Sequence, residues 1–427
     1  MAAERGRRTA GLLAGFHRHH QSQQAVCFFV FSVLNMARRY LIWMSAFFSL
    51  TLLPVFALNL LLANNTLGNN KKALLASEWQ QATHGVTYAP TLADTHLFKT
   101  LRLNDRLPEI NGVVFGSSTA LGVTAAMFPP PLKIYNFAQT GHGLASVIGE
   151  IEALLDRDGQ VKWFIVPLDW SLGFLYQSDV LGKADLSLAT ARALALSDHG
   201  PHVTLLEQLR DALSYPRIAS LFAILKDVLR AEDKAQAFAQ YFFRDAGDDY
   251  RCTDGTPAKD FDTFFRGSCT GFRFDGSATF ANLSPLSANE AKRLIAAAVL
   301  PSSKYAASLV QTQGEPNEEL LRRLTEAAWR AEAKKGKLVL FMPPLLPGLE
   351  QAFFDAPGLN VALSRTVQML NAWAQQTGVT IINAGQSERY GCVAEEFVDE
   401  HHALPACYAK VFARYWQDKP DAGLYTP

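Results

Sequence analysis

Short apolar runs alternate with segments of helical period in two parts of the chain, residues 108–170 and 317–427. The run at 161–168 is almost continuously apolar, as in strands that are buried on both faces of a parallel sheet. Strands and amphipathic helices joined by short connections predict a doubly wound α/β sheet. The expected strands are 113–115, 132–137, 161–168, 337–342 and 379–383, and the expected helices are 143–155, 317–335, 361–376 and 406–416.

This alternation stops between residues 171 and 316. The pattern there predicts mostly helices, and residues 245–276 are rich in Gly, Asp and Cys. We expect a helical insertion over the C-terminal edge of the sheet, where ligands bind in such folds. Both a role in substrate choice and a role in docking a partner fit that position. The expected helices are 186–196, 203–213, 216–232, 235–243 and 287–299.

The most apolar stretch lies near the N-terminus. Residues 41–63 carry no charge and are long enough to cross a bilayer as a helix. Arg38 and Arg39 come directly before this stretch, which predicts a cytoplasmic N-terminus and export of the rest. A cleaved signal peptide with its cleavage site at 55–57 is the competing interpretation. We prefer a transmembrane anchor because the apolar run continues past that site.

The segments on either side of this span are expected outside the membrane. Residues 1–40 would form a cytoplasmic segment that is first basic and rich in His and Gln and then apolar from Ala25 to Leu34, a stretch too short to span a bilayer. Met36 precedes Ala-Arg-Arg, which has the character of a natural start, so translation from Met36 and from Met1 are both open. Residues 64–107 are polar and irregular, which indicates a linker or stalk that leads to the sheet.

Charge and length exclude one class of partner and leave the architecture open. The 427 residues allow one large domain or two modest ones. Lys+Arg and Asp+Glu both number 40, and no basic run is interleaved with aromatic residues. We therefore expect no nucleic-acid partner.

The five cysteines are consistent with export. Cys27 precedes the expected anchor, and the other four form two local couples, Cys252 with Cys269 and Cys392 with Cys407. Four cysteines allow three pairings, so local pairing is a hypothesis, and four separate buried thiols are the alternative. Each local disulfide would be worth about 3 kcal/mol in an oxidising compartment. No Cys-x-x-Cys occurs, so a zinc ribbon is not indicated.

Two short motifs carry candidate chemistry. Gly116-Ser117-Ser118 follows the first expected strand, and the glycine allows a sharp turn that presents a hydroxyl group at the sheet edge. Asp399 and His402 stand three residues apart before the last expected helix. A nucleophilic serine needs a base to take its proton and a carboxylate to orient that base. Helix capping by the serines is the alternative interpretation.

At these residues the chain resembles the SGNH (GDSL-like) hydrolase superfamily. It is most similar to membrane-anchored members that modify cell-surface polymers, such as alginate acetylation proteins and the teichoic-acid D-alanylation protein. The resemblance covers residues 109–170 and 337–416. It implies the flavodoxin-like sheet of SGNH hydrolases, with Ser118 as nucleophile, His402 as base and Asp399 as the carboxylate that orients it.

The resemblance also implies an oxyanion hole. The family's second block assigns the backbone N–H of Gly141 to it, beside the N–H of Ser118. The third block departs from the family, because residues 167–170 read Pro-Leu-Asp-Trp and hold no asparagine. A third donor would then be Asn136 or be absent, and Asp169 would donate only when protonated.

Residues next to these motifs are expected around the substrate. His401 is one position off the family spacing, so we expect it on the surface or in contact with substrate. His142 would line the pocket or be an ordinary loop residue, and Trp170 would offer a wall for sugar stacking or lie in the core. The expected pocket residues are Ser117, His142, Asp169, Trp170 and His401.

The resemblance implies a single-pass protein of the bacterial inner membrane with a periplasmic catalytic domain. Its activity would be the transfer or removal of an O-acetyl or other acyl group on an envelope or secreted polysaccharide, through an acyl-serine intermediate. A polytopic membrane-bound O-acyltransferase would be its partner. No metal or organic cofactor is expected, since a serine triad needs none. A non-catalytic scaffold of a polysaccharide assembly complex is the alternative, and a secreted lipase is a third hypothesis.

Overall fold

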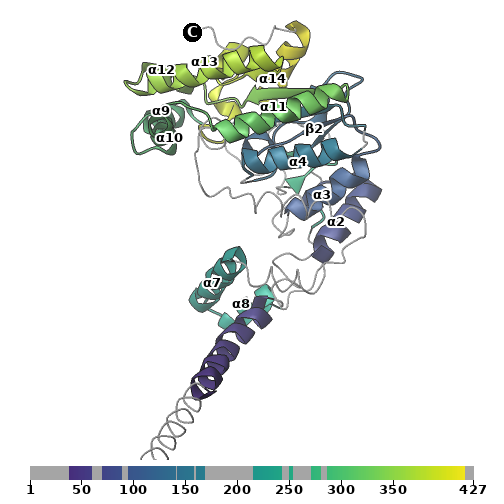
Figure 1. Ribbon diagram of the computed structural model, residues 1–427, viewed down its shortest axis with the longest axis vertical. Coiled ribbons are helices and arrows are strands. Elements are labelled where there is room, and N and C mark those ends of the chain that lie inside the picture. The colour runs from purple at the N-terminus through teal and green to yellow at the C-terminus, as the bar shows by residue number, and fades with distance from the viewer. Residues whose placement is uncertain are drawn as a thin grey trace, which may run out of the picture. The chain divides into compact units, whose positions relative to one another are not determined.

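The computed structural model describes nine stretches of the chain: residues 38–59, 70–88, 95–140, 142–157, 160–168, 215–242, 250–252, 271–279 and 286–418. Figure 1 labels the helices and strands that these stretches form. The chain divides into two compact units, which are Met1–Ala63 with Thr204–Phe243 and Asn64–Val203 with Arg244–Pro427.

The first unit contains the expected membrane span. Helix Arg38–Asn59 has 22 residues and is long and apolar enough to cross a membrane, by length and composition. A signal sequence meets the same criteria, so both interpretations of this segment stand. The unit also contains α7 (Tyr215–Arg230) and α8 (Lys234–Phe242), which confirm two expected helices. Residues 1–37, 60–63, 186–196 and 203–213 lie outside the described residues.

The second unit is built on a five-stranded parallel sheet. The strands run in the order β3-β2-β4-β7-β8. Numbered along the chain within this sheet, that order is the 2-1-3-4-5 arrangement of flavodoxin-like doubly wound sheets. The predicted parallel α/β sheet is confirmed. Its strands are β2 (Gly112–Val114), β3 (Ile134–Asn136), β4 (Trp163–Pro167), β7 (Lys337–Met342) and β8 (Thr380–Asn383).

Helices cover both faces of this sheet. Helices α4, α11 and α13 lie in the connections between successive parallel strands, and right-handed crossovers place them on one face. Helix α14 follows the last strand and lies on the other face. Arg323 of α11 forms two hydrogen bonds, of 3.1 and 2.6 Å, with Glu152 of α4. On the opposite face, Phe412 of α14 packs against Phe341 of β7, with ring centroids 5.7 Å apart. The four helices are α4 (Leu144–Asp156), α11 (Glu318–Ala333), α13 (Leu359–Thr377) and α14 (Pro405–Asp418).

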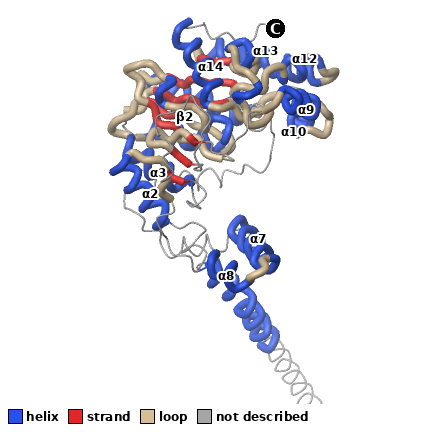
Figure 2. The backbone as a smooth tube through the Cα atoms, turned by 180° about the vertical axis from the view of Figure 1, so that it is seen from behind, coloured by secondary structure: helices blue, strands red, loops and turns tan. Residues whose placement is uncertain are grey.

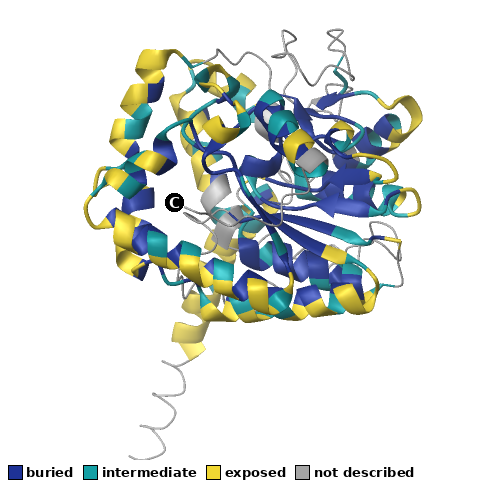
Figure 3. Cartoon of the chain, turned by 90° about the horizontal axis from the view of Figure 1, so that it is seen from above, coloured by how far each residue is buried: buried dark blue, intermediate teal, exposed yellow. Residues whose placement is uncertain are grey.

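The core lies between these layers. Figure 2 shows the strands enclosed by helices, and Figure 3 shows that the strands are buried while the helices expose their outer faces. Val113, Val114 and Phe115 are fully buried, and so are Leu340 and Phe341. This burial on both faces explains why the strands appear as continuous apolar runs in the sequence.

The expectation of an irregular linker at residues 64–107 is wrong for the residues that are described there. They form α2 (Asn70–Thr83) and α3 (Thr95–Arg106), and β1 (Thr87–Tyr88) joins a small antiparallel sheet. The other strands of this sheet are β5 (Gly271–Phe272) and β6 (Ala278–Thr279). The described residues between 70 and 106 are therefore part of the folded second unit and not a linker that leads to it.

The buried face of α3 carries two cations. Lys99 is fully buried and donates to the carbonyl oxygen of Ala138 at 2.5 Å. Burial lowers the pKa of Lys99 to about 7. Arg102 is also fully buried, and its guanidinium donates to Gln81 at 2.7 Å and to Asp105 at 3.0 Å. These internal partners compensate charges that ordinarily face water.

Part of the expected insertion lies at the carboxyl edge of the sheet. In the β5–β6 hairpin, the carbonyl oxygen of Asp275 accepts from the Asn136 N–H at the end of β3 at 2.7 Å. The N–H of Ala278 donates to the carbonyl oxygen of Leu121 at 2.9 Å. Three further helices follow along the chain, of which the first confirms the helix expected at 287–299. They are α9 (Ala288–Ala298), α10 (Lys304–Thr312) and α12 (Leu349–Asp355).

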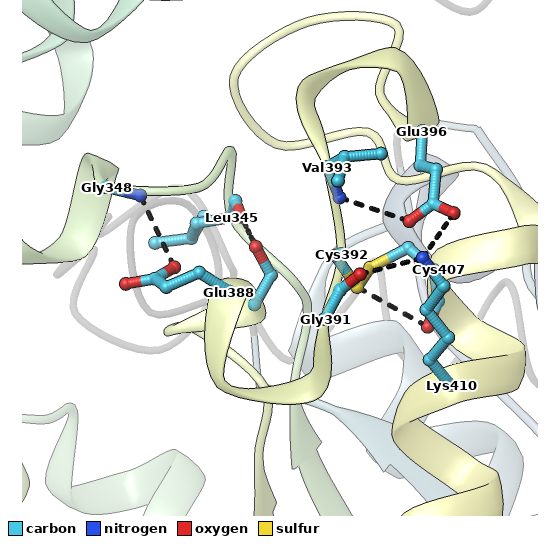
Figure 4. Close-up of a disulfide and its surroundings, with 10 residues drawn as sticks. Leu345, Gly348, Glu388, Gly391, Cys392, Val393, Glu396, Cys407 and Lys410 are labelled. Carbon is cyan, nitrogen blue, oxygen red and sulfur yellow. Dashed lines mark hydrogen bonds and ion pairs between the residues drawn. A yellow bond between two sulfur atoms is a disulfide. The ribbon is translucent and has the colours of Figure 1, made fainter.

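One of the two predicted disulfides is confirmed. Cys392 and Cys407 are bonded, with Cα atoms 5.1 Å apart (Figure 4). The disulfide joins the loop before Asp399 to α14. Beside it, Lys410 of α14 pairs with Glu396 at 2.6 Å. The other predicted pair includes Cys269, which lies outside the described residues.

Removing this disulfide is expected to destabilise the second unit. The double variant Cys392→Ala/Cys407→Ala frees a loop with a sequence separation of 15. The free energy of unfolding should fall by about 3 kcal/mol. Denaturant unfolding of the full chain in detergent measures it, with Val393→Ala, at an exposed side chain beside Cys392, as the control that should leave stability nearly unchanged. Equal stability of wild type and double variant would contradict this role.

Glu350 is a buried acid on α12. Its side chain is 1% exposed. Burial and, next, the charge of Glu388 raise the pKa of Glu350 to about 8. The folded protein therefore holds a proton that the unfolded chain releases near the ordinary pKa of about 4.3.

Because Glu350 binds a proton more tightly in the folded state, we expect the free energy of unfolding to depend on pH. The contribution of Glu350 is fully present below pH about 4.3 and is lost as the pH rises through about 8, with a slope of up to about 1.4 kcal/mol per unit. Glu350→Gln should flatten that slope and stabilise the protein at pH 8 relative to wild type. Urea unfolding between pH 5 and 8 measures the slope, with the exposed Glu395→Gln as control. Identical slopes in wild type and Glu350→Gln would show that Glu350 is already ionised.

Candidate active site

A tight turn after β2 presents Ser118. Gly116 has a φ of +119°, and a Cβ atom there would lie 2.1 Å from Pro167 Cγ of β4, so glycine is required. Ser117 caps the short 3-10 helix η2 (Ser118–Ala120), because its Oγ accepts from the N–H of Thr119. The capping interpretation thus applies to Ser117, and the Ser118 hydroxyl has another partner.

That partner is His402, 284 residues further along the chain. Ser118 Oγ lies 2.8 Å from His402 Nε2. His402 Nδ1 lies 2.7 Å from Asp399 Oδ2. Asp399 Oδ1 accepts from the backbone N–H groups of His401 and His402, both at 2.9 Å. The structure therefore brings the three predicted catalytic residues into one hydrogen-bonded chain.

A closed loop holds the acid and the base. The N–H of Val398 donates to the carbonyl oxygen of His402 at 2.9 Å. The N–H of Leu404 donates to the backbone carbonyl oxygen of Glu396 at 2.8 Å. The loop after β7 supports it, because the N–H of Leu346 donates to the carbonyl oxygen of Glu400 at 3.0 Å. Asp399 and His402 thus sit on a backbone that is fixed on both sides.

The Asp399 carboxylate is stabilised in its charged form. Burial alone would raise the pKa of Asp399, but the hydrogen bond from His402 and the nearby imidazoles of His401 and His402 outweigh it. The pKa of Asp399 lies well below its usual range as a result. An ionised carboxylate can hold the His402 tautomer with its proton on Nδ1.

The side chain of Asn136, one of the two alternatives for the third oxyanion-hole donor, is hydrogen-bonded to the backbone instead. Its side-chain Nδ2 donates to the carbonyl oxygens of Ala120 at 2.8 Å and Val123 at 2.7 Å. Its Oδ1 accepts from the N–H of Ala138 at 2.9 Å. Both amide hydrogens are used, so this buried side chain ties the loop after Ser118 to β3. The other expected residues Gly141, Asp169 and Trp170 lie outside the described residues.

His401 is buried, so the expectation of a surface position is wrong for it. Its ring lies 4.0 Å from the ring of His402, centroid to centroid. Its Nδ1 lies 2.6 Å from the hydroxyl group of Tyr305 on α10. Sequence reasoning missed Tyr305. Ser303, which caps α10, and the apolar positions that follow it could have revealed the helix but not this contact.

His142 contacts a residue that the sequence did not single out. Its Nε2 lies 2.8 Å from Glu150 Oε1 on α4, and His96 Nε2 of α3 lies 3.5 Å from the same oxygen. The loop that carries His142 adjoins the nucleophile turn, because the N–H of Gln139 donates to the carbonyl oxygen of Gly116 at 2.8 Å.

Among the described residues, three groups have the donor atoms for a metal ion. They are His96 with His142 and Glu150, Asp399 with His401 and His402, and Cys392 with Glu396 and Cys407. The third contains the disulfide, which removes both thiolates from use. The second contains the acid Asp399 and the base His402 of the candidate triad, together with His401.

No protein-family model matches the chain, and no curated protein matches it either. The geometry of the site therefore carries the functional argument.

Proposed function

We propose that this protein is a membrane-anchored serine acyl-transfer enzyme of the SGNH type. It acts as an O-acyltransferase or an esterase on a cell-envelope or secreted polysaccharide. The observation that carries the proposal is the hydrogen-bonded chain from Ser118 through His402 to Asp399. This is the arrangement by which a serine hydroxyl becomes a nucleophile.

The first half of the reaction forms an acyl-serine. With its proton on Nδ1 shared with Asp399, His402 presents the lone pair of Nε2 to the Ser118 hydroxyl. Ser118 Oγ attacks the acyl carbonyl carbon while His402 takes its proton, and Asp399 stabilises the imidazolium. The C–O bond to the donor alcohol breaks, and His402 protonates the departing oxygen.

The second half releases the acyl group. Water or an acceptor hydroxyl attacks the acyl-serine, and His402 Nε2 takes the proton of the attacking group. The bond to Ser118 Oγ breaks and the serine recovers its proton from His402. An esterase uses water in this step and a transferase uses a sugar hydroxyl, with the same residues in both.

The fold supports the SGNH assignment. The sheet has the 2-1-3-4-5 order, Ser118 follows the first strand of that sheet, and the Asp-x-x-His motif precedes the last helix. Ligands of such sheets bind at the carboxyl ends of the strands, where both motifs stand.

The helix Arg38–Asn59 supports a single-pass inner-membrane anchor, and the disulfide Cys392–Cys407 supports a periplasmic location. An anchored domain at this surface can receive its acyl group from a polytopic O-acyltransferase in the same membrane. The acceptor would be the polysaccharide.

A non-catalytic scaffold of a polysaccharide assembly complex is the second candidate. The use of both Asn136 amide hydrogens by Ala120 and Val123 favours it, because the expected side-chain donor of the oxyanion hole is taken.

A covalent probe separates the two candidates. The full chain in detergent is treated with a fluorophosphonate, digested and mapped, and the enzyme proposal expects the label on Ser118. Turnover of p-nitrophenyl acetate with and without an oligosaccharide acceptor then distinguishes acetate release from transfer. A folded chain with neither label nor turnover would favour the scaffold.

A further inference from the structure

A second cluster of titratable side chains lies outside the candidate triad. It consists of His96 on α3, His142 on the loop after β3 and Glu150 on α4. The three donor atoms lie within 4.8 Å of one another. The imidazole rings of the two histidines are stacked, with centroids 5.7 Å apart.

Two polar atoms of this cluster need a partner. Within the part of the chain that the structure describes, His96 Nε2 and Glu150 Oε2 are buried and form no hydrogen bond. Buried polar atoms of native proteins are generally satisfied by protein, water or an ion. A single ion placed between His96, His142 and Glu150 would satisfy both atoms.

We propose that His96, His142 and Glu150 bind a divalent transition metal ion, with Zn²⁺ as the preferred ion. Two imidazole nitrogens and one carboxylate are a ligand set that Zn²⁺ takes in proteins, with water in the fourth position. Tetrahedral bonds of about 2.0–2.1 Å hold ligand atoms about 3.3 Å apart. Glu150 Oε1 lies 2.8 and 3.5 Å from the two Nε2 atoms, so small side-chain rotations suffice.

The charges of the cluster suit a cation. Burial alone would raise the pKa of Glu150, but the hydrogen bond with His142 and the nearby imidazole of His96 outweigh it and lower that pKa. The carboxylate is therefore available as an anionic ligand. The nearby cation is Lys99, whose pKa burial lowers to about 7 and whose Nζ is held by Ala138. Because part of the Lys99 population is uncharged near pH 7, its repulsion of a metal ion is reduced.

The site lies close to the surface. The side chains of His96 and His142 are 28% and 15% exposed, whereas that of Glu150 is 7% exposed. Both imidazole rings are thus partly exposed to solvent, although His96 Nε2 itself is buried. A metal ion bound to His142 Nε2 takes the lone pair of that nitrogen, so the ring proton must then be on Nδ1.

The ion would join three separate elements. It would tie α3 to α4 and fix the loop of His142, which is hydrogen-bonded to Gly116 through Gln139. Whatever the activity of the protein, the ion would support the turn that carries Ser118.

Metal binding to the full chain tests the proposal. The protein in detergent is stripped with a chelator, incubated with excess zinc sulfate, desalted and measured for zinc. We expect about one zinc ion per chain in wild type, and this ion should be lost in both His96→Gln and His142→Gln. His402→Gln is the matched control, because it disrupts the rival cluster at the triad and should keep the ion.

Thermal unfolding gives a second, independent readout. Zinc should raise the melting temperature of stripped wild type, because an ion that binds only the folded state stabilises it. Zinc should leave the melting temperature of His142→Gln unchanged. The proposal is overturned if wild type neither retains zinc nor melts higher with it. Zinc that survives both His96→Gln and His142→Gln, or is lost only in His402→Gln, also overturns it.

Discussion

Ser118→Ala is expected to lower p-nitrophenyl acetate turnover by at least about a thousandfold and to abolish fluorophosphonate labelling. The variant removes the hydroxyl group that His402 Nε2 is placed to deprotonate, at 2.8 Å. It leaves the Gly116 turn and the Ser117 cap in place, so the fold should not change. Initial rates and intact-protein mass spectrometry measure the two effects.

Ser117→Ala is the matched control for this experiment. It removes a neighbouring hydroxyl whose partners are the N–H and the hydroxyl group of Thr119. Loss of this cap should cost about 1 kcal/mol of stability and leave labelling intact. Equal labelling of Ser118→Ala and wild type would disprove the assignment of the nucleophile.

Asp399→Asn is expected to lower turnover by about a thousandfold to ten-thousandfold while preserving the fold. An asparagine keeps one acceptor oxygen, which the N–H groups of His401 and His402 would take, as they take Oδ1 now. Its NH₂ group would then face His402 Nδ1, where it can only donate. His402 would adopt the tautomer with its proton on Nε2, which cannot accept the proton of Ser118.

In Asp399→Asn, kcat should therefore fall by a much larger factor than KM changes. Glu400→Gln provides the control, since Glu400 is the adjacent acid and lies 3.6 Å from His401 Nδ1. Its turnover should stay close to that of wild type. An Asp399→Asn protein with wild-type turnover would mean that the tautomer is set by another group.

The parallel sheet could be predicted because its strands are buried on both faces. Residues 161–168 and 337–342 are almost purely apolar. Such short apolar runs are typical of strands that are buried on both faces of a parallel sheet. Helix α3 could not be predicted in the same way, because its buried face contains Lys99 and Arg102. Their compensation by Ala138 and Gln81 depends on tertiary contacts that the local pattern does not carry.

The triad was accessible from sequence because short motifs place its residues at the ends of elements. Gly116 must turn the chain after β2, and Asp399 and His402 must share one loop before α14. The role of Asn136 was not accessible. Its amide is used by carbonyl groups of residues 120 and 123, which reach it only through the folded loop between β2 and β3.

The distance between Ser118 and His402 along the chain has a consequence for biosynthesis. The proposed nucleophile follows the first strand of the five-stranded sheet, whereas the proposed base lies 284 residues later. A polypeptide still leaving the ribosome thus carries the serine without the histidine. Under the proposed function, chains halted before residue 399 should be inert towards the probe, and acyl transfer would begin only after synthesis of the whole domain.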